Sequence, residues 1–235
     1  MRTPNVLVLL TSSVMLASCG SSGTSTTQPI VSSCFDVAIL TVRAAGEAPG
    51  EGVTSAVVDK IIAGTPRTVE RASINYPADP DNYASSVASG VISMKERLSA
   101  QISLCPNEKI VLLGYSQGAG VVLDALGGGG GGTLGGTVSP VSASVASHIT
   151  AAVVFGDSRH VAGQSYNAGT ATRSGLYPRT GEQLSALSAL AARLRAYCDA
   201  GDPYCDKGSD LRVHLQYVNR YQAEASQWVV TLIGT

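Results

Sequence analysis

Length, composition and charge narrow the classes of protein to which this chain can belong. It has 235 residues, of which 44% are hydrophobic and 14% charged, and its formal net charge is -1 at pH 7. So small a net charge provides no basic surface for a polyanion, and nucleic-acid binding is therefore not expected. The 26 glycines and the high apolar content are typical of one closely packed α/β domain and not of a disordered chain.

The N-terminus has the features of an export signal. Arg2 precedes two apolar stretches, at 6–10 and 14–17, and small residues follow them. Polar residues separate the two stretches, which are too short for a permanent membrane-spanning helix. We therefore exclude this segment from the fold and expect a secreted protein without a stable membrane span.

A second interpretation of the N-terminus involves Cys19. The string LASC resembles the lipobox of bacterial lipoproteins, in which this cysteine carries the lipid and the polar residues after it form a tether. We favour ordinary signal cleavage. The expected organisation is a signal peptide at 1–22 (or a lipoprotein signal ending before Cys19), a flexible lead-in at 23–33 and one folded, monomeric domain at 34–235.

Four short apolar runs predict buried strands. They are rich in aliphatic and β-branched residues and are bounded by Gly, Pro, Asn or Asp, as strands buried on both faces are. They cover residues 37–42, 72–76, 110–113 and 151–155. Stretches typical of helices, at 53–63 and 83–104, lie between them. This alternation predicts a parallel sheet covered by helices.

The second half of the chain predicts a buried helix at 118–126, followed by the glycine run Gly127–Gly132. Glycine-rich loops can bind phosphate through backbone amides, but this run lacks a GxxxxGK[ST] pattern and follows a helix, so we expect a mobile surface loop. Residues 183–197 have helical spacing, although 194–197 fit a last short strand equally well. A final amphipathic helix is expected at about 221–232.

These elements predict the fold class α/β. The expected architecture is a three-layer α/β/α sandwich around a central, mainly parallel sheet of five strands. No internal repeat is visible in the sequence.

The cysteines fit an oxidising compartment. Apart from Cys19 there are four, Cys34, Cys105, Cys198 and Cys205, an even number that suits two disulfides. A zinc site is less favoured because the chain has no CxxC pair and its three histidines are far apart in sequence. The short gap between Cys198 and Cys205 favours a local pair, which leaves Cys34 to pair with Cys105. No metal or other cofactor is expected.

The string GYSQG at 114–118 predicts a nucleophile elbow. A strand-like run precedes it and a helix-like run follows it, which is the context that this turn requires. Ser116 would occupy a strained turn, and the flanking glycines would leave room for the neighbouring backbone. Its hydroxyl would then be exposed at the carboxyl edge of the sheet, where α/β folds bind ligands.

A serine hydroxyl needs a general base, and the base needs an acid that orients it. In the order Ser, acid, His that this fold uses, three histidines follow Ser116. His148 has only Asp124 as an upstream acid, and His160 leaves the last third of the chain without a role. His214 lies in a polar stretch before the last helix, and we favour it as the base.

Four aspartates near the end of the chain precede His214, namely Asp199, Asp202, Asp206 and Asp210. Asp202 lies between the two local cysteines and is followed by Pro203, whose ring fixes the backbone. A carboxylate that must hold an imidazole in one tautomer benefits from such a restraint. We favour Asp202, with Asp199 in the same loop as the rival, although a simple turn-capping role for Asp202 is the alternative.

The residues in these motifs resemble the cutinase and acetylxylan esterase family of small secreted serine esterases. The resemblance rests on GYSQGAG at the elbow, CDAGDPYC around Asp202 and HLQY after it, and on INYPA, YASSVASGV, FGD and SYNAGT elsewhere. It extends from about Cys34 to the end of the chain. It implies a minimal α/β-hydrolase fold without a large lid, a site open to a polymer, and hydrolysis of carboxylic esters.

Residue by residue, the resemblance implies that Ser116 is the nucleophile, Asp202 the acid and His214 the base. It also implies an oxyanion hole formed by the backbone amide of Gln117 and by a Ser or Thr in the loop after the first strand. Here that position is Ala45, a departure that would cost about 3 kcal/mol of transition-state stabilisation if a hydroxyl is lost. Ser158 replaces a proline that is frequent in the family.

The sequence leaves the substrate open. Leu211, Val213 and Leu215 around His214 would line an acyl pocket. The resemblance includes enzymes that act on cutin and others that remove acetyl groups from xylan, and we favour the acetylxylan branch. The alternatives are a cutinase acting on cutin or lipid polyesters, and a non-catalytic, wall-associated module, which only the substitution at Ala45 supports.

Overall fold

The computed structural model describes residues 34–234. The expected signal peptide, the lipobox cysteine Cys19 and the lead-in at 23–33 lie outside the described residues. Within them, six strands form one sheet in the order β2-β1-β3-β4-β6-β5, and every neighbouring pair is parallel. The strands are β1 (Val37–Val42), β2 (Val69–Ser73), β3 (Lys109–Tyr115), β4 (Ile149–Phe155), β5 (Asn167–Ala168) and β6 (Leu194–Tyr197).

The middle of the sheet contains the strands that the apolar runs predict. Every residue of β1 is buried, and β3 and β4 are buried along almost their whole length. Because helices cover both faces of a parallel sheet, such strands are apolar at successive positions and do not alternate. Leu112 pairs with Leu40 on one side and with Ala152 on the other, which places these apolar runs side by side.

Two strands differ from expectation at the edges of the sheet. The sheet has six strands and not five, because the two residues of β5 pair with β6, a contact too short to leave a periodic pattern in the sequence. The strand expected at 72–76 is β2, which begins at Val69 and ends at Ser73. As an edge strand β2 is half exposed and contains Glu70 and Arg71, so its apolar signal is weak.

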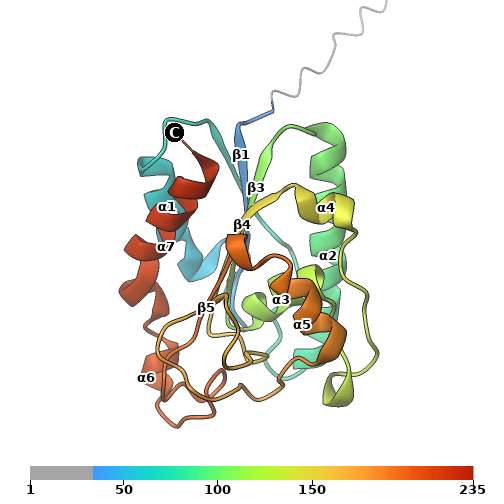
Figure 1. Ribbon diagram of the computed structural model, residues 1–235, viewed down its shortest axis with the longest axis vertical. Coiled ribbons are helices and arrows are strands. Elements are labelled where there is room, and N and C mark those ends of the chain that lie inside the picture. The colour runs from blue at the N-terminus through green and yellow to red at the C-terminus, as the bar shows by residue number, and fades with distance from the viewer. Residues whose placement is uncertain (1–33, 235) are drawn as a thin grey trace, which may run out of the picture. The chain divides into compact units, whose positions relative to one another are not determined.

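The helices form a layer on each face of the sheet (Figure 1). One layer contains α2 (Tyr83–Leu104), α3 (Gln117–Gly127), α4 (Ala143–Ser147) and α5 (Gly181–Ser188). The other contains α1 (Ser55–Ala63) and α7 (Tyr217–Ile233), which pack against each other. Short elements in the connections are η1 (Gly52–Thr54), η2 (Gly132–Leu134), η3 (Ala191–Arg193) and α6 (Leu211–His214). The described residues thus form the expected three layers.

Helical spacing of apolar residues identifies the buried side of α2. Val87, Val91, Met94 and Leu98 are all buried in the core on that face of the sheet. On the opposite face α7 contributes Ala225, Val229 and Ile233, among others, to a second core. The two cores hold the sheet between them, so that the ends of the strands are fixed in position for the site.

The glycine run is more ordered in its packing than the sequence suggests. The expectation of a surface loop is wrong for Gly127–Gly129, which are buried, because the run begins inside α3 and continues against it. Gly129 exchanges two backbone hydrogen bonds of 2.9 Å with Val138. Gly130 has a φ of 68°, and a side chain there would lie 1.9 Å from the carbonyl oxygen of Gly136. Only glycine fits this backbone path.

Two disulfides join the described cysteines. Cys34 pairs with Cys105, and Cys198 pairs with Cys205, which are the pairs expected from the sequence. The first links the segment before β1 to the end of α2, and the second closes the loop after β6. In residues 34–234 no helix combines the length and apolar character that a membrane crossing needs.

Candidate active site

Ser116 lies between β3 and α3 in a conformation that side chains rarely adopt. Its φ is 53° and its ψ is -116°, and its amide donates to the carbonyl oxygen of Phe155 at 2.8 Å. The glycines on either side allow the sharp turn. A side chain at Gly114 would lie 2.6 Å from the carbonyl oxygen of Gly118, and one at Gly118 would lie 2.2 Å from that of Val42. The turn therefore has the geometry of a nucleophile elbow.

Three side chains distant in sequence meet at this turn. Nε2 of His214 lies 2.9 Å from Oγ of Ser116, and Nδ1 of His214 lies 2.8 Å from Oδ2 of Asp202. A neutral imidazole that donates from Nδ1 to the carboxylate accepts at Nε2, so the serine hydroxyl donates to the ring. The structure brings together the three residues that the sequence analysis selected. Ser116 follows β3, whereas Asp202 and His214 follow β6, with His214 as the last residue of α6. The carboxyl ends of β3 and β6 share one edge of the sheet.

The carboxyl group of Asp202 is fully buried, and hydrogen-bond donors surround it. Oδ1 accepts from the amides of Tyr204 and Cys205 at 2.7 and 3.0 Å, and Oδ2 accepts from the Tyr217 hydroxyl at 2.8 Å as well as from His214. Burial is the largest single effect and favours the neutral acid. The hydrogen bond and charge of His214 with the other donors outweigh it, so the pKa of Asp202 lies below its ordinary value.

The neighbouring aspartates have other partners. Asp199 accepts from the amide and hydroxyl of Thr170 and from the Tyr221 hydroxyl at 2.7 Å, and it pairs with Arg220. Asp206 accepts from three backbone amides, and Asp210 accepts from the amide of Arg212 at the start of α6. Each of these carboxylates fixes the loop around the site, and Asp202 is the one in contact with His214.

Two backbone amides at the site have no partner within the described part of the chain. Gln117 is the first residue of α3, where the amide has no acceptor in the helix, and Ala45 lies in the loop after β1. Both residues line the pocket that contains Ser116. The side chain of Gln117 is held from both ends, because it accepts from the Ser86 hydroxyl at 3.0 Å and donates to the carbonyl oxygen of Asp79 at 2.9 Å.

Glu47 holds the loop that contains Ala45. Its carboxylate accepts from the amide of Ala44 at 2.6 Å and from that of Val53 at 2.9 Å, while its carbonyl oxygen accepts from Nε of Arg43. The amide of Gly46 is bonded to the carbonyl oxygen of Ala78 at 2.8 Å. With both neighbours bonded, the amide of Ala45 is fixed in position, as a preorganised donor must be.

A cavity of about 380 Å³ lies around the Ser116 hydroxyl, and we call this candidate site the catalytic pocket. Its lining is largely apolar and aromatic, with Tyr83, Tyr115, Tyr177 and Tyr204 among the residues that contribute. Leu211 and Leu215 line it as the sequence analysis expected, and Val213 is not among the lining residues. The Tyr204 ring covers the His214 imidazole, with 4.5 Å between ring centres. Ligand pockets of this size and composition bind small organic groups.

The sequence analysis missed the residues that support the three central side chains. Tyr217 was visible only as part of the HLQY string, three residues after His214, and Ser86 only as part of the YASSVASGV string, while Glu47 was not singled out. Gly156 belongs to the FGD string, and a side chain there would lie 2.7 Å from Cε1 of His214. In residues 34–234 no three His, Cys, Asp or Glu side chains are grouped so as to hold a metal ion.

Comparison with known proteins agrees with this geometry. An acetylxylan esterase 2 from Talaromyces purpureogenus is 36% identical to this chain, over 86% of this chain and 88% of its own length. A cutinase 11 from Verticillium dahliae is 32% identical, over 84% of this chain and 68% of its own length. A solved structure of an acetylxylan esterase superposes with a TM-score of 0.79 at 35% identity, covering 86% of this chain and all of the other. Because the Cutinase profile also matches residues 33–233, nearly the whole described chain, the protein belongs to the cutinase family.

Proposed function

We propose that this protein is a serine esterase that removes acetyl groups from acetylated xylan, with Ser116 as nucleophile, His214 as base and Asp202 as orienting acid. The observation that carries the proposal is the continuous chain of contacts from the Ser116 hydroxyl through His214 to Asp202, at 2.9 and 2.8 Å. These distances are those at which a serine hydroxyl is activated by an imidazole.

In the acylation step, Oγ of Ser116 bonds to the ester carbonyl carbon while Nε2 of His214 takes the hydroxyl proton. The electron pair of the carbonyl bond moves to oxygen, and the amides of Gln117 and Ala45 donate to that oxyanion. The partial positive charge at the N-terminus of α3 adds to this stabilisation. The tetrahedral intermediate then collapses, and the imidazolium gives its proton to the departing sugar hydroxyl.

In the deacylation step, water replaces the alcohol. Nε2 of His214 takes a proton from the water as the water oxygen bonds to the acyl carbon, and a second oxyanion forms at the same two amides. Collapse breaks the bond to Oγ of Ser116, which recovers its proton from the imidazolium. Throughout, the charged carboxylate of Asp202 favours the imidazolium form, and the low pKa of Asp202 keeps the proton on the histidine.

The choice of acetyl ester is supported by the relatives and by the pocket. The proteins most similar in sequence and structure include acetylxylan esterases that the chain matches over most of their length. Around Ser116 the aromatic rings of Tyr115 and Tyr204 contribute walls to a pocket of about 380 Å³ that also has to accept part of the alcohol. A small acyl group leaves the most room for a sugar.

A second candidate is hydrolysis of cutin or lipid polyesters. It is favoured by Leu211 and Leu215 at the rim of the pocket, which are 49% and 59% exposed. Two exposed leucines next to the catalytic histidine would make contact with a long acyl chain. The activity profile over acyl-chain length distinguishes the two functions.

The test combines covalent labelling with a series of 4-nitrophenyl esters. A fluorophosphonate probe should label the protein and should fail to label Ser116→Ala, with Ser89→Ala, an exposed serine on α2, as the matched control. Activity falling steeply beyond four acyl carbons supports deacetylation, and a flat or rising profile supports the cutinase function. A folded protein that is neither labelled nor active would overturn both and would favour the non-catalytic module.

The compartment forms part of the proposal. Two disulfides in a domain of this size fit an oxidising compartment outside the cell, in agreement with the export signal expected at the N-terminus. The proposed enzyme is therefore extracellular.

A further inference from the structure

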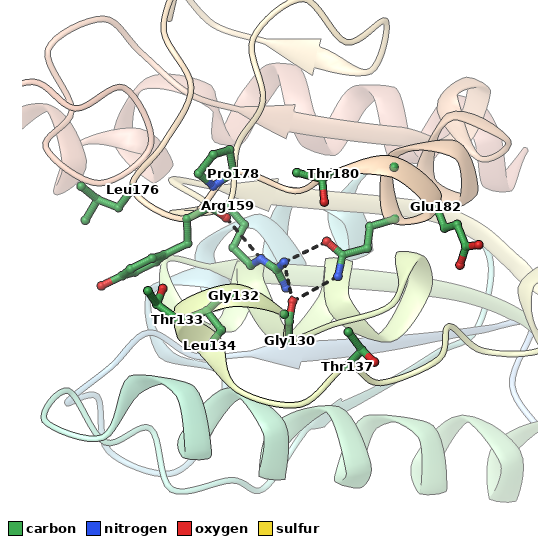
Figure 2. Close-up of a pocket in the computed structure, with 14 residues that line it drawn as sticks. Gly130, Gly132, Thr133, Leu134, Thr137, Arg159, Leu176, Pro178, Thr180 and Glu182 are labelled. Carbon is green, nitrogen blue, oxygen red and sulfur yellow. Dashed lines mark hydrogen bonds between the residues drawn. The ribbon is translucent and has the colours of Figure 1, made fainter.

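A second pocket lies beside the catalytic pocket. It is a cavity of about 460 Å³, with the backbone of Gly130–Gly132 as one wall and residues 176–178 and 180–183 as the other (Figure 2). Leu176 and Tyr177 line both pockets, so the two cavities adjoin at these residues. A ligand long enough to pass over Tyr177 reaches Ser116 with one part and the second pocket with another. We call this cavity the glycine-loop pocket.

A network of hydrogen bonds lies at the floor of the glycine-loop pocket. Nη2 of Arg159 donates to the carbonyl oxygen of Gly130 at 3.0 Å and to Oε1 of Gln183 at 2.9 Å, and Nε2 of Gln183 donates to the same carbonyl at 3.2 Å (Figure 2). Nε of Arg159 points to the carbonyl oxygen of Tyr177 at 3.4 Å. The buried guanidinium of Arg159 thus bonds to both walls of the pocket, including Tyr177, which also lines the pocket around Ser116.

The charges at this pocket do not favour an anion. Arg159 is 3% exposed and pairs with Asp124, which is equally buried, through Nη1 and Oδ2 at 2.6 Å. Asp124 also pairs with Arg179, and Arg179 pairs with Asp157, so two buried cations face two buried carboxylates. The exposed side chain of Glu182 adds a negative charge to the lining. A phosphate or carboxylate ligand would therefore find no free positive charge here.

The lining matches a neutral ligand that has many hydroxyl groups. Thr133, Thr137 and Thr180 are exposed and contribute hydroxyls from different sides of the cavity (Figure 2). Leu134 and Pro178 contribute apolar surface between them. Sugar rings present hydroxyls at their edges and carbon-bound hydrogens on their faces, and binding sites for such ligands combine polar and apolar groups in this way. Glycine residues in the remaining wall let a ring approach the backbone closely.

We infer that the glycine-loop pocket binds the unmodified sugar units of the polysaccharide whose neighbouring unit presents its acetyl ester to Ser116. The inference rests on the proposed esterase function and adds a binding site for the polymer backbone to it. It also gives a role to the run of glycines that the chemistry at Ser116 does not use. In this arrangement the chain of sugars crosses Tyr177, from the catalytic pocket to the wall formed by Gly130–Gly132.

The first test measures binding without turnover. Xylohexaose, which has no ester, is titrated into the Ser116→Ala protein by calorimetry, and then into the same protein with Thr180→Trp. Thr180 precedes α5 with an extended backbone that tryptophan also adopts, and the new ring fills the cavity. We expect binding to weaken about tenfold or more with the filled pocket. Thr231→Trp, an exposed threonine on α7 across the sheet, is the matched control and should bind like the parent.

The second test measures hydrolysis by the protein with Ser116 intact. The ratio of kcat/KM for acetylated xylan to kcat/KM for 4-nitrophenyl acetate should fall about tenfold in Thr180→Trp and in the double variant Thr133→Ala/Thr137→Ala, which removes two hydroxyls. The fall should come mainly from KM for the polymer. If tryptophan at 180 prevents folding, as judged by circular dichroism, the double variant tests the inference instead, because alanine at the exposed positions 133 and 137 leaves the core packing unchanged.

The outcomes separate this inference from the proposed function. A protein that hydrolyses 4-nitrophenyl acetate while its Ser116→Ala form binds no xylohexaose keeps the esterase function and loses the sugar site. Equal polymer kinetics in the parent and in both pocket variants would also overturn the sugar site. A protein that binds xylohexaose in this pocket and cleaves no ester keeps the sugar site and loses the esterase function.

Discussion

The hydroxyl of Tyr217 donates to the same oxygen of Asp202 that receives the N–H of His214, with 2.8 Å for each contact. Tyr217 is fully buried, and its oxygen also accepts from the amide of Asp199 at 2.8 Å. One phenol thus fixes both the acid and the loop in which the acid lies. This relationship makes Tyr217 a positioning residue of the proposed mechanism.

Tyr217→Phe is expected to lower kcat about tenfold and to raise the pKa of Asp202, because one donor to the carboxylate is lost. The acid limit of the pH–activity profile should therefore move to higher pH. Kinetics of 4-nitrophenyl acetate hydrolysis between pH 3 and 8 measure both effects. Tyr221→Phe, on the same helix, removes a hydroxyl that binds Asp199 and is the matched control. An unchanged acid limit in Tyr217→Phe would contradict the positioning role.

Asp202→Asn is expected to reduce kcat by about 10⁴ with little change in the backbone, because the amide holds the imidazole in the wrong tautomer. Asp199→Asn is the comparison. Asp199 binds Thr170, Tyr221 and Arg220, so this change should destabilise the loop. The molecules that remain folded should keep most of the parent's kcat. Steady-state rates and urea unfolding distinguish the two variants. A larger loss of kcat in Asp199→Asn than in Asp202→Asn would make Asp199 the acid.

Stability should decrease in acid. The pKa of Asp202 in the folded protein lies below its ordinary value of 3.8. The pKa of Asp206 is also lowered. Burial raises the pKa of Asp206, but hydrogen bonds from the amides of Gly201 and Thr172 and from the Arg173 side chain lower it by more. As the pH falls, these carboxylates therefore bind protons in the unfolded chain before they do so in the folded protein. The stabilisation is complete above the pKa of the unfolded chain, and it is lost as the pH falls through the pKa values of the folded protein. Urea unfolding at pH 7, 5 and 3 measures this. The decrease should be smaller in Asp206→Asn, and an equally steep decrease would argue against this account.

The two disulfides should affect different properties. Cys34 and Cys105 are 71 residues apart, and replacing both with Ala should cost about 4 kcal/mol of the free energy of unfolding, against about 2 kcal/mol for the seven-residue separation of Cys198 and Cys205. The short loop contains Asp202, so its opening should reduce kcat, whereas loss of the long-range link should leave the rate per folded molecule unchanged. Urea unfolding and active-site titration with a fluorophosphonate measure the two quantities. An equal loss of kcat after removal of either disulfide would contradict the specific role of the Cys198–Cys205 loop in holding Asp202.

The loop after β1 that contains Ala45 offers a test of the proposed oxyanion hole. Ala45→Ser adds a hydroxyl next to an amide that Glu47 already holds in position, and kcat should rise, by up to about 10² if the hydroxyl reaches the oxyanion. KM should change little, because the hydroxyl acts on the transition state. Ala48→Ser, at an exposed position of the same loop, is the control. A fall in kcat would mean that position 45 accommodates no side-chain donor.

What the sequence reveals about this fold depends on where a residue lies in the sheet. The central strands are apolar at every position, because both faces are covered, and helix α2 has a clean helical period, so both were predictable. The edge strands β2 and β5 were not well predicted, since their pairing is set by tertiary contacts and not by local pattern. The burial of Gly127–Gly129 has the same origin, because no side chain signals it.

The site follows a similar division. The elbow around Ser116 has a local signature in the sequence. Chain order narrowed the candidate partners, and the polar stretch around His214 and the cysteine loop around Asp202 led to the choice of these two, with Asp199 left as a rival. The supporting contacts depend on exact distances between loops. Ser158 is an example: it departs from the family pattern, and its hydroxyl lies 2.7 Å from that of Tyr83 at the wall of the catalytic pocket, a bond that a proline cannot make.

The parallel sheet also determines where the described chain can be attached to something else. Ser116 follows the last residue of β3, whereas Lys109 at the first residue of β3 binds the carbonyl oxygen of Ile233, and Gly234 accepts from Arg67 nearby. Cys34 is joined to Cys105 at this same end of the sheet. Both ends of the described chain thus lie at the end of the sheet opposite the one at which Ser116 follows β3. Figure 1 shows the C-terminus and the start of β1 at the same end of the molecule. Immobilisation on a solid support, or fusion to a second module, through either end would leave the pocket facing outward.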